Sequence, residues 1–172
     1  MGMEPSYLIR VEETWGSEPS VVYQMVPLPP VRVRAKGSRM GSPPEGTLEG
    51  FLLKDGDRAQ VKVCHRPVPG GRSAATVYRT LQRRGGLSLV GCRLLTGRTH
   101  QIRAQMAHAG WPLLGDGKYG SERFNKQYGE KGQALYSYKL RFEFPTDAGL
   151  LNYLRGREFT VDKIDFAEKY FD

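Results

Sequence analysis

The sequence predicts an α+β fold with a mixed, largely antiparallel sheet and short flanking helices. Three observations lead to that class. Apolar and polar residues alternate over residues 59–95, interrupted by Gly- and Pro-rich turns, which is typical of half-buried strands. A helical spacing follows Thr96-Gly97, and a second long alternation covers residues 135–144. Strands joined by short turns favour antiparallel pairing, because parallel strands need longer crossovers.

The N-terminal residues differ from the rest, and we expect a divergent, partly irregular segment over 1–46 ahead of one domain over 47–172. Proline occupies five positions between residues 27 and 44. Since proline lacks a backbone donor, a central strand or a long helix across 27–46 is disfavoured. Residues 7–11 and 31–33 have the pattern of short edge strands.

Three strands are expected next, over residues 59–64, 75–81 and 87–95, paired as an antiparallel meander. The turn between the first two contains Pro67, Pro69, Gly70 and Gly71. Gly85-Gly86 separates the second from the third.

A helix is expected after the third strand. Ile102 and Met106 are four residues apart and fall on one side of it, with Thr96 or Thr99 as its N-cap and Gly110 as its stop. The clearest strand of the chain then covers residues 135–144, and a short helix is expected around 147–155.

The net charge of +8 is concentrated in one part of the chain. Residues 55–103 contain ten basic and two acidic side chains, whereas residues 1–54 and 104–172 are each neutral overall. Nine of the ten bases are arginine, which suits bidentate contacts to phosphate. We therefore favour a nucleic-acid partner over a solvated basic face.

Several classes of protein are excluded or disfavoured by the same sequence. It has no run of 18 apolar residues and no basic, apolar leader at its start, so we expect a cytoplasmic protein without a membrane partner. Its two cysteines make no disulfide framework, and its three histidines include no i,i+4 pair. We expect no metal site, and Walker-type phosphate loops are absent from the sequence.

The sharpest motif is Leu95-Thr96-Gly97-Arg98-Thr99-His100-Gln101-Ile102-Arg103. A strand that enters a helix exposes free N–H groups in the first turn, and this turn also has two arginines, a histidine and a glutamine. The residues alone therefore predict a site for a phosphorylated or carboxylate-bearing group.

This motif, followed by Gly110-Trp111-Pro112-Leu113-Leu114-Gly115-Asp116-Gly117-Lys118-Tyr119-Gly120, resembles the signature of RluA-type pseudouridine synthases. Residues 51–55, 73–78 and 135–144 also resemble family segments, so the resemblance covers roughly residues 46–145. It implies that residues 47–172 are part of the pseudouridine synthase catalytic domain, resembling the C-terminal part of that fold. These enzymes detach a uracil in rRNA or tRNA from its ribose and rejoin it through carbon 5, without a cofactor.

The resemblance also implies roles for individual residues. Arg103 matches the catalytic-site arginine that pairs with the catalytic aspartate and holds it ionised. Arg98, Thr99, His100 and Gln101 match positions that line the RNA-facing side of the cleft. We expect Asp116, in its Gly-rich turn, to bind its own backbone rather than to act in catalysis.

The sequence departs from the family in one decisive place. The family's catalytic aspartate lies in a His-Arg-Leu-Asp segment upstream of the matched motifs, and residues 1–54 contain neither aspartate nor histidine. The first hypothesis is a synthase fragment with reduced or no activity alone, whose catalytic motif was lost by truncation, gene splitting or a change of reading frame and whose missing half a separate chain supplies. The second is a non-catalytic RNA-binding module of synthase ancestry. A basic structural protein of a ribonucleoprotein is the third, and the long motif match disfavours it.

Overall fold

The computed structural model describes the backbone of residues 22–27 and the chain over 45–56, 58–84, 86–142, 144, 146–161 and 163–171. These residues form two antiparallel sheets with short helices, so the predicted α+β class is confirmed. The edge strands expected at 7–11 and 31–33 lie outside the described residues. Within the described part, no helix is both long and apolar enough to cross a membrane.

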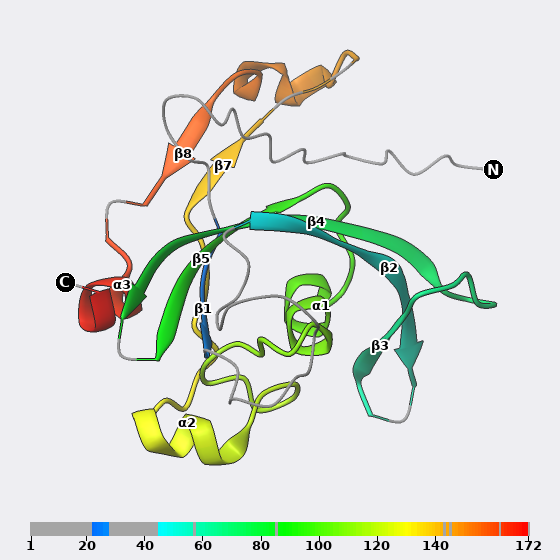
Figure 1. Cartoon of the computed structure of the whole chain (residues 1–172). Helices are drawn as coiled ribbons and strands as arrows, with labels where there is room; N and C mark the ends of the chain where they lie inside the picture. Colours follow the sequence, from blue (N-terminus) through cyan, green and yellow to red (C-terminus); the bar gives the residue numbers. More distant parts are fainter. Residues whose placement is uncertain are drawn as a thin grey trace.

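The elements in chain order are β1 (Val22–Pro27), β2 (Glu45–Asp55), β3 (Gln60–Cys64), β4 (Arg72–Arg84), β5 (Leu87–Leu94), α1 (Gln101–His108), α2 (Glu122–Tyr128), β6 (Leu135–Ser137), β7 (Lys139–Arg141), the 3-10 helix η1 (Gly149–Leu154), β8 (Glu158–Thr160) and α3 (Asp165–Phe171). The main sheet has the order β3-β2-β4-β5-β1-β6, and every neighbouring pair is antiparallel. Figure 1 shows this curved sheet arching over α1. Helix η1 confirms the short helix expected around 147–155.

The predicted meander of three consecutive strands is wrong at its first step. Strand β2 lies between β3 and β4, where Leu52 pairs with Val63 on one side and with Arg72 on the other. Only the β4–β5 hairpin is paired as the meander requires. Alternation tells which side chains share a face, but it does not identify the neighbouring strand, because the ladder joins segments that are distant in sequence.

Strand β1 is a second feature that the sequence did not predict. It falls within residues 1–46, yet it pairs with β5 along its whole length and with β6 over Val22–Gln24. Pro27 is its last residue, a position where a missing donor interrupts no further ladder. The short pattern preceding the prolines therefore forms an interior strand, and the division of the chain at residue 46 stays a prediction.

The long strand expected over 135–144 is also wrong, because its partners change midway. β6 pairs with β1 in the main sheet, whereas β7 pairs with β8 in a separate two-stranded sheet. Between them, the carbonyl of Tyr138 accepts a hydrogen bond from Val161 N–H at 2.9 Å. A continuous alternation thus serves two sheets.

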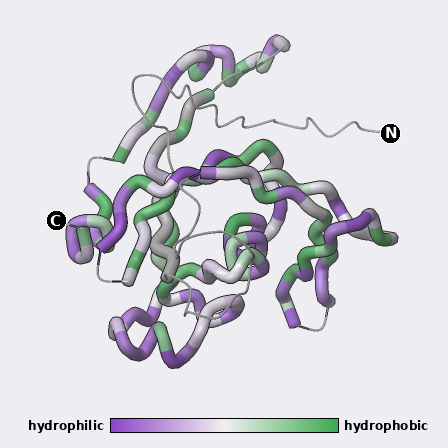
Figure 2. Tube along the Cα trace, viewed as in Figure 1, coloured by the Kyte–Doolittle hydropathy of each residue, from purple (hydrophilic) through white to green (hydrophobic). Residues whose placement is uncertain are grey.

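The core lies between the main sheet and the elements that cover it. Tyr78, Val90 and Cys92 of β4 and β5 pack against Ile102 and Met106 of α1. Hydrophobic and hydrophilic residues alternate in bands along the chain (Figure 2). In β5, by contrast, Leu87–Cys92 are all buried, so this strand is covered on both faces.

A second cluster fixes the segment that follows α1. Leu114 is fully buried against Leu87 and Ala134, and aromatic residues of α2 and α3 pack around them. This packing anchors the start of the turn over residues 115–120 beside α1 (Figure 1).

Candidate nucleic-acid interface

The start of α1 is organised by Gln101, whose side chain is buried and fully hydrogen-bonded. Its Oε1 accepts hydrogen bonds from Arg98 N–H at 3.1 Å and Thr96 Oγ1 at 2.8 Å. Its Nε2 donates to Ala75 O and Thr76 Oγ1, both at 2.9 Å. Because Gln101 is 3% exposed, it ties the loop before α1 to β4 and does not face solvent, contrary to its expected place on the RNA-facing side.

The predicted N-cap is wrong as well. The residue before α1 is His100, which has a left-handed φ of 52° and makes no side-chain cap bond. Thr96 Oγ1 instead accepts a hydrogen bond from Ala75 N–H at 3.0 Å, and Thr99 is exposed. The stop at Gly110 is confirmed, since this residue follows the C-cap Ala109 and has a φ of 90°.

Arg103 forms a bidentate ion pair with Asp116. Its Nε lies 2.8 Å from Oδ2 and its Nη2 lies 2.8 Å from Oδ1, the fork geometry that arginine favours with a carboxylate. The side chain of Asp116 is fully buried, and that of Arg103 is 12% exposed. Asp116 therefore has no surface through which it can meet a substrate.

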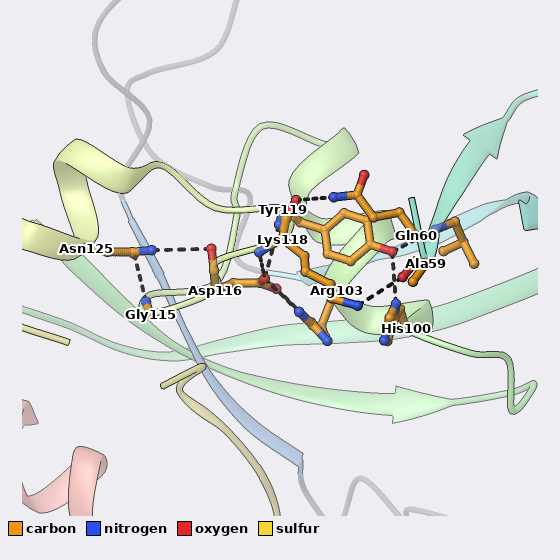
Figure 3. Close-up of polar contacts among 10 residues, drawn as sticks. Ala59, Gln60, His100, Arg103, Gly115, Asp116, Lys118, Tyr119 and Asn125 are labelled. Atoms are coloured by element: carbon orange, nitrogen blue, oxygen red, sulfur yellow. Dashed lines mark hydrogen bonds and ion pairs between the residues drawn. The ribbon is translucent and has the colours of Figure 1, made fainter. Parts of the chain in front are cut away.

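The carboxylate of Asp116 also closes its own turn. Its Oδ1 accepts hydrogen bonds from the N–H groups of Lys118 and Tyr119, at 2.8 and 3.1 Å, so the expected turn-forming role is confirmed. Burial raises the pKa of Asp116, but the hydrogen bonds from Arg103, Lys118 and Tyr119 outweigh it and hold that pKa below its ordinary value. Asn125 of α2 adds a hydrogen bond to the carbonyl of Asp116 (Figure 3).

Tyr119 links this turn to the β2–β3 hairpin. Its hydroxyl accepts a hydrogen bond from Val61 N–H at 2.8 Å and lies 3.0 Å from Nδ1 of His100 (Figure 3). Its ring lies 5.3 Å from the guanidinium carbon of Arg103, within cation–π distance. Tyr119 therefore contacts both His100 and Arg103 of the motif and helps to hold them in place.

The environment of His100 disfavours its charged form. Burial lowers its pKa first, and the positive charges of Arg103 and Lys118 lower it further. A neutral imidazole leaves Nδ1 free to accept the proton of the Tyr119 hydroxyl.

Lys118 completes the contact between the turn and the hairpin. Its Nζ donates to the carbonyl of Ala59 at 3.1 Å, and its own carbonyl accepts from Nε2 of Gln60 at 2.9 Å. The segments around residues 60 and 118 are thus joined side by side (Figure 3).

A pocket of about 400 Å³ opens beside this cluster. It is lined by residues of β2, β3 and β4, of the turn between β3 and β4, and of the loop before α1: Leu52, Leu53, Lys54, Val61, Gly70, Arg72, Gly97, Arg98 and Thr99. Three of these residues are cationic, and none of the nine is acidic. Arg98 is positioned by a hydrogen bond from its Nε to the carbonyl of Ser73 at 3.1 Å.

The five residues predicted for the site thus separate into three places. Arg98 and Thr99 line the pocket, Arg103 and His100 join the cluster around Asp116 and Tyr119, and Gln101 is interior. Sequence reasoning missed Lys54 and Arg72 as pocket residues. Arg72 comes near Arg98 because Arg98 contacts the neighbouring Ser73, and Lys54 joins them through the pairing of β2 with β4. It also missed the partner of Arg103, for which the Gly-Asp-Gly turn after the helix was the available signal.

The described residues contain no group of three or more metal-ligating side chains. His65 and His108, distant in sequence, do meet, with their Nε2 atoms 3.0 Å apart. They form one tilted ring pair between the end of β3 and the last residue of α1.

Comparisons with known proteins agree with the motif. The family profile described as RNA pseudouridylate synthase matches residues 2–108. An uncharacterized RNA pseudouridine synthase of Chloroflexus aurantiacus is 45% identical over 86 residues, which are 49% of this chain and 26% of that protein. The ribosomal large subunit pseudouridine synthase D of Neisseria meningitidis is 33% identical over 152 residues, covering 83% of this chain and 40% of that protein.

The fold has a counterpart among solved structures. The human protein titled RNA pseudouridylate synthase domain containing 1 matches with a TM-score of 0.50 and 18% identity, over 87% of this chain and 65% of that one. This similarity shows a shared fold. The chain spans between a quarter and two fifths of the length of the two curated relatives named above.

Proposed function

Because the chain belongs to the RluA-type family of RNA pseudouridylate synthases, we propose that it binds rRNA or tRNA in the cytoplasm and contributes the arginine side of a uridine-isomerising site. One observation carries this proposal. The motif over residues 96–103 has Arg98 and Thr99 at a cationic pocket, in the loop before α1, and Arg103 in the adjoining cluster, in the first turn of α1. Phosphate contacts from arginine supply most of the affinity of such surfaces for RNA.

The isomerisation itself makes a demand that the described residues do not meet. The bond between N1 of uracil and C1′ breaks, a bond between C5 and C1′ forms, the proton at C5 leaves, and N1 gains one. A carboxylate at C1′, as nucleophile or base, is the group that the reaction needs. The carboxylate that contacts Arg103 in the described structure is Asp116, which is fully buried and cannot reach a uridine. We therefore propose that the chain alone binds RNA with little or no turnover and that a separate chain brings the reactive carboxylate.

A second function is favoured by the ion pair between Arg103 and Asp116, which leaves neither carboxylate oxygen free. Both carboxylate oxygens of Asp116 accept hydrogen bonds from Arg103 at 2.8 Å. Asp116 thus already occupies the place beside the arginine that the family gives to its catalytic aspartate. On this view the chain is a non-catalytic RNA-binding module, and the pair is purely structural.

The experiment uses RNA transcribed with uridine tritiated at C5, since pseudouridine formation releases that tritium. We expect the purified chain to bind the RNA, with an affinity that falls steeply with salt, and to release no tritium. Arg98→Ala should weaken binding about tenfold, while Arg84→Ala, which removes an exposed arginine outside the pocket, serves as the matched control. Affinity that is flat with salt, or unchanged in Arg98→Ala, would contradict the assignment of this surface to RNA.

Turnover separates the two functions. Tritium release that appears when the chain is added back to a cell extract lacking it, and that is lost with Arg103→Lys, supports the isomerase. The lysine variant keeps a positive charge beside Asp116 but loses the bidentate fork. RNA binding without release in either setting supports the binding module. Release at a normal rate by the chain alone would refute the need for a second carboxylate.

A further inference from the structure

We propose that the pocket between β2, β3, the start of β4 and the loop before α1 is a phosphodiester site, which holds the RNA backbone next to the Arg103 cluster. This inference rests on the proposed function for its partner, because it takes RNA as the bound polymer. It adds two residues outside the motif, Lys54 and Arg72, and assigns them a ligand group.

Strand register brings the cations to one face of the sheet. Leu52 lies opposite Arg72 in the β2–β4 ladder, and Lys54 lies opposite Val61 in the β2–β3 ladder. Residues directly opposite each other share a face, as do residues two apart on one strand. The side chains of Lys54 and Arg72 therefore stand on the same face, around the buried Leu52 and Val61.

The third cation of the pocket is Arg98, which comes from the loop before α1 and is held in place by a hydrogen bond. Arg98 uses its Nε to hold the carbonyl of Ser73, next to Arg72 at the start of β4. A guanidinium anchored at Nε keeps its terminal N–H groups for an anion, and Nη1 and Nη2 of Arg98 have no partner within the described residues. Three positive charges without an acidic neighbour in the lining make an anion the fitting occupant.

The lining favours the backbone of the RNA over its bases. It contains no aromatic side chain on which a base can stack. Of its apolar members, Leu52 and Val61 are only 4% and 7% exposed and Leu53 is half-buried. Gly70 and Gly97 leave room for close approach, and the exposed Thr99 offers a hydroxyl donor. Such a site contacts phosphate and ribose and does not read sequence.

The pocket is coupled to the motif cluster through the β2–β3 hairpin. Val61 lines the pocket, and its backbone N–H donates to the hydroxyl of Tyr119, whose ring lies over Arg103. A phosphodiester held at Arg98 is thus connected to the Arg103 cluster through Val61 and Tyr119.

The test measures how affinity for single-stranded RNA depends on salt. The probes are a twelve-nucleotide oligouridylate and an oligoadenylate of equal length, titrated into the full chain and into the double variant Lys54→Ala/Arg72→Ala. Both side chains are exposed, so the variant should fold, and a thermal melt verifies this. Each lost phosphate contact lowers the slope of log K against log salt by about 0.7 for a single strand, so we expect a fall of about 1.4 and affinity at least tenfold weaker.

The outcomes divide clearly. An equal loss for both oligonucleotides, with Arg84→Ala unchanged, supports a backbone site at this pocket. If the wild type binds RNA and the double variant has the same slope of log K against log salt, the assignment of this pocket to phosphodiester is refuted but the proposed function is not. A loss confined to oligouridylate overturns the backbone assignment in favour of base recognition. No RNA binding by the wild type overturns the proposed function itself.

Discussion

Replacing Asp116 by asparagine removes one charge from a pair that is almost fully out of water. The variant keeps the size and one acceptor of the side chain, so its effect reports the ion pair and not a cavity. Asp116 accepts two hydrogen bonds from Arg103 and two from the backbone of its own turn, all between 2.8 and 3.1 Å. An amide presents a donor to the guanidinium in place of an oxygen, so at least one of these contacts becomes donor against donor.

The magnitude follows from burial. Breaking a buried pair by removing one partner costs about 3–5 kcal/mol, because the remaining charge is left uncompensated. Arg103 is 12% exposed, which gives its charge a partial route to water, so we expect a loss of about 3 kcal/mol. That is a large share of the roughly 5–15 kcal/mol that stabilises a typical domain.

Urea unfolding followed by circular dichroism measures the loss. With a slope of about 2 kcal/mol per molar urea, the midpoint of the Asp116→Asn variant should fall by about 1.5 M. The chain offers its own control in Glu122→Gln, which breaks the i,i+4 pair with Lys126, where both side chains are at least 75% exposed. That control should cost no more than about 0.5 kcal/mol. If Asp116→Asn costs as little as the control, the inference that this pair organises the motif cluster is refuted.

The stability difference between the wild type and Asp116→Asn should also depend on pH, in a direction that the pKa of Asp116 determines. The pKa of Asp116 in the folded protein lies below its ordinary value of 3.8, so folding favours the ionised form. The stabilisation is fully present above that ordinary value and is lost as the pH falls through the folded pKa. The difference between wild type and Asp116→Asn should therefore be constant near neutral pH and shrink on acidification below about pH 4.

Three further substitutions test the titration of His100 and the backbone at two glycines. The pKa of His100 is lowered in the folded state, so the unfolded chain binds more protons, and stability should fall as the pH drops below about 6.5. His100→Asn, which tolerates the left-handed φ of 52°, should flatten the urea midpoint between pH 7.5 and 5.5; an unchanged profile would contradict the assignment. Gly110→Ala should cost about 1–2 kcal/mol in urea unfolding for its positive φ, since nothing lies within 4 Å of the added Cβ. Gly115→Ala should cost about 3 kcal/mol or more, because its Cβ would lie 1.8 Å from the carbonyl oxygen of Gly132; equal losses at both glycines would refute the predicted clash.

The sequence was most informative where the signal is local. The hairpin β4–β5, the helix after Gly97 and the stop at Gly110 follow from side-chain period and turn chemistry, and the structure has all three. It was least informative where a residue's environment depends on distant strands. Gln101 belongs to an RNA-facing motif by sequence, yet β4 supplies partners that bury its amide.

By itself the sequence determined the family, the α+β class and the position of the positive charge between residues 55 and 103, because these depend on residue identity and short spacing. Only the tertiary structure decided that β2 lies between β3 and β4, and therefore that Lys54 and Arg72 share a pocket with Arg98. It also decided that Arg103 is paired with a buried Asp116. The reason is that a strand's period specifies which face a side chain occupies, whereas its neighbours are set by hydrogen bonds between segments far apart in the chain.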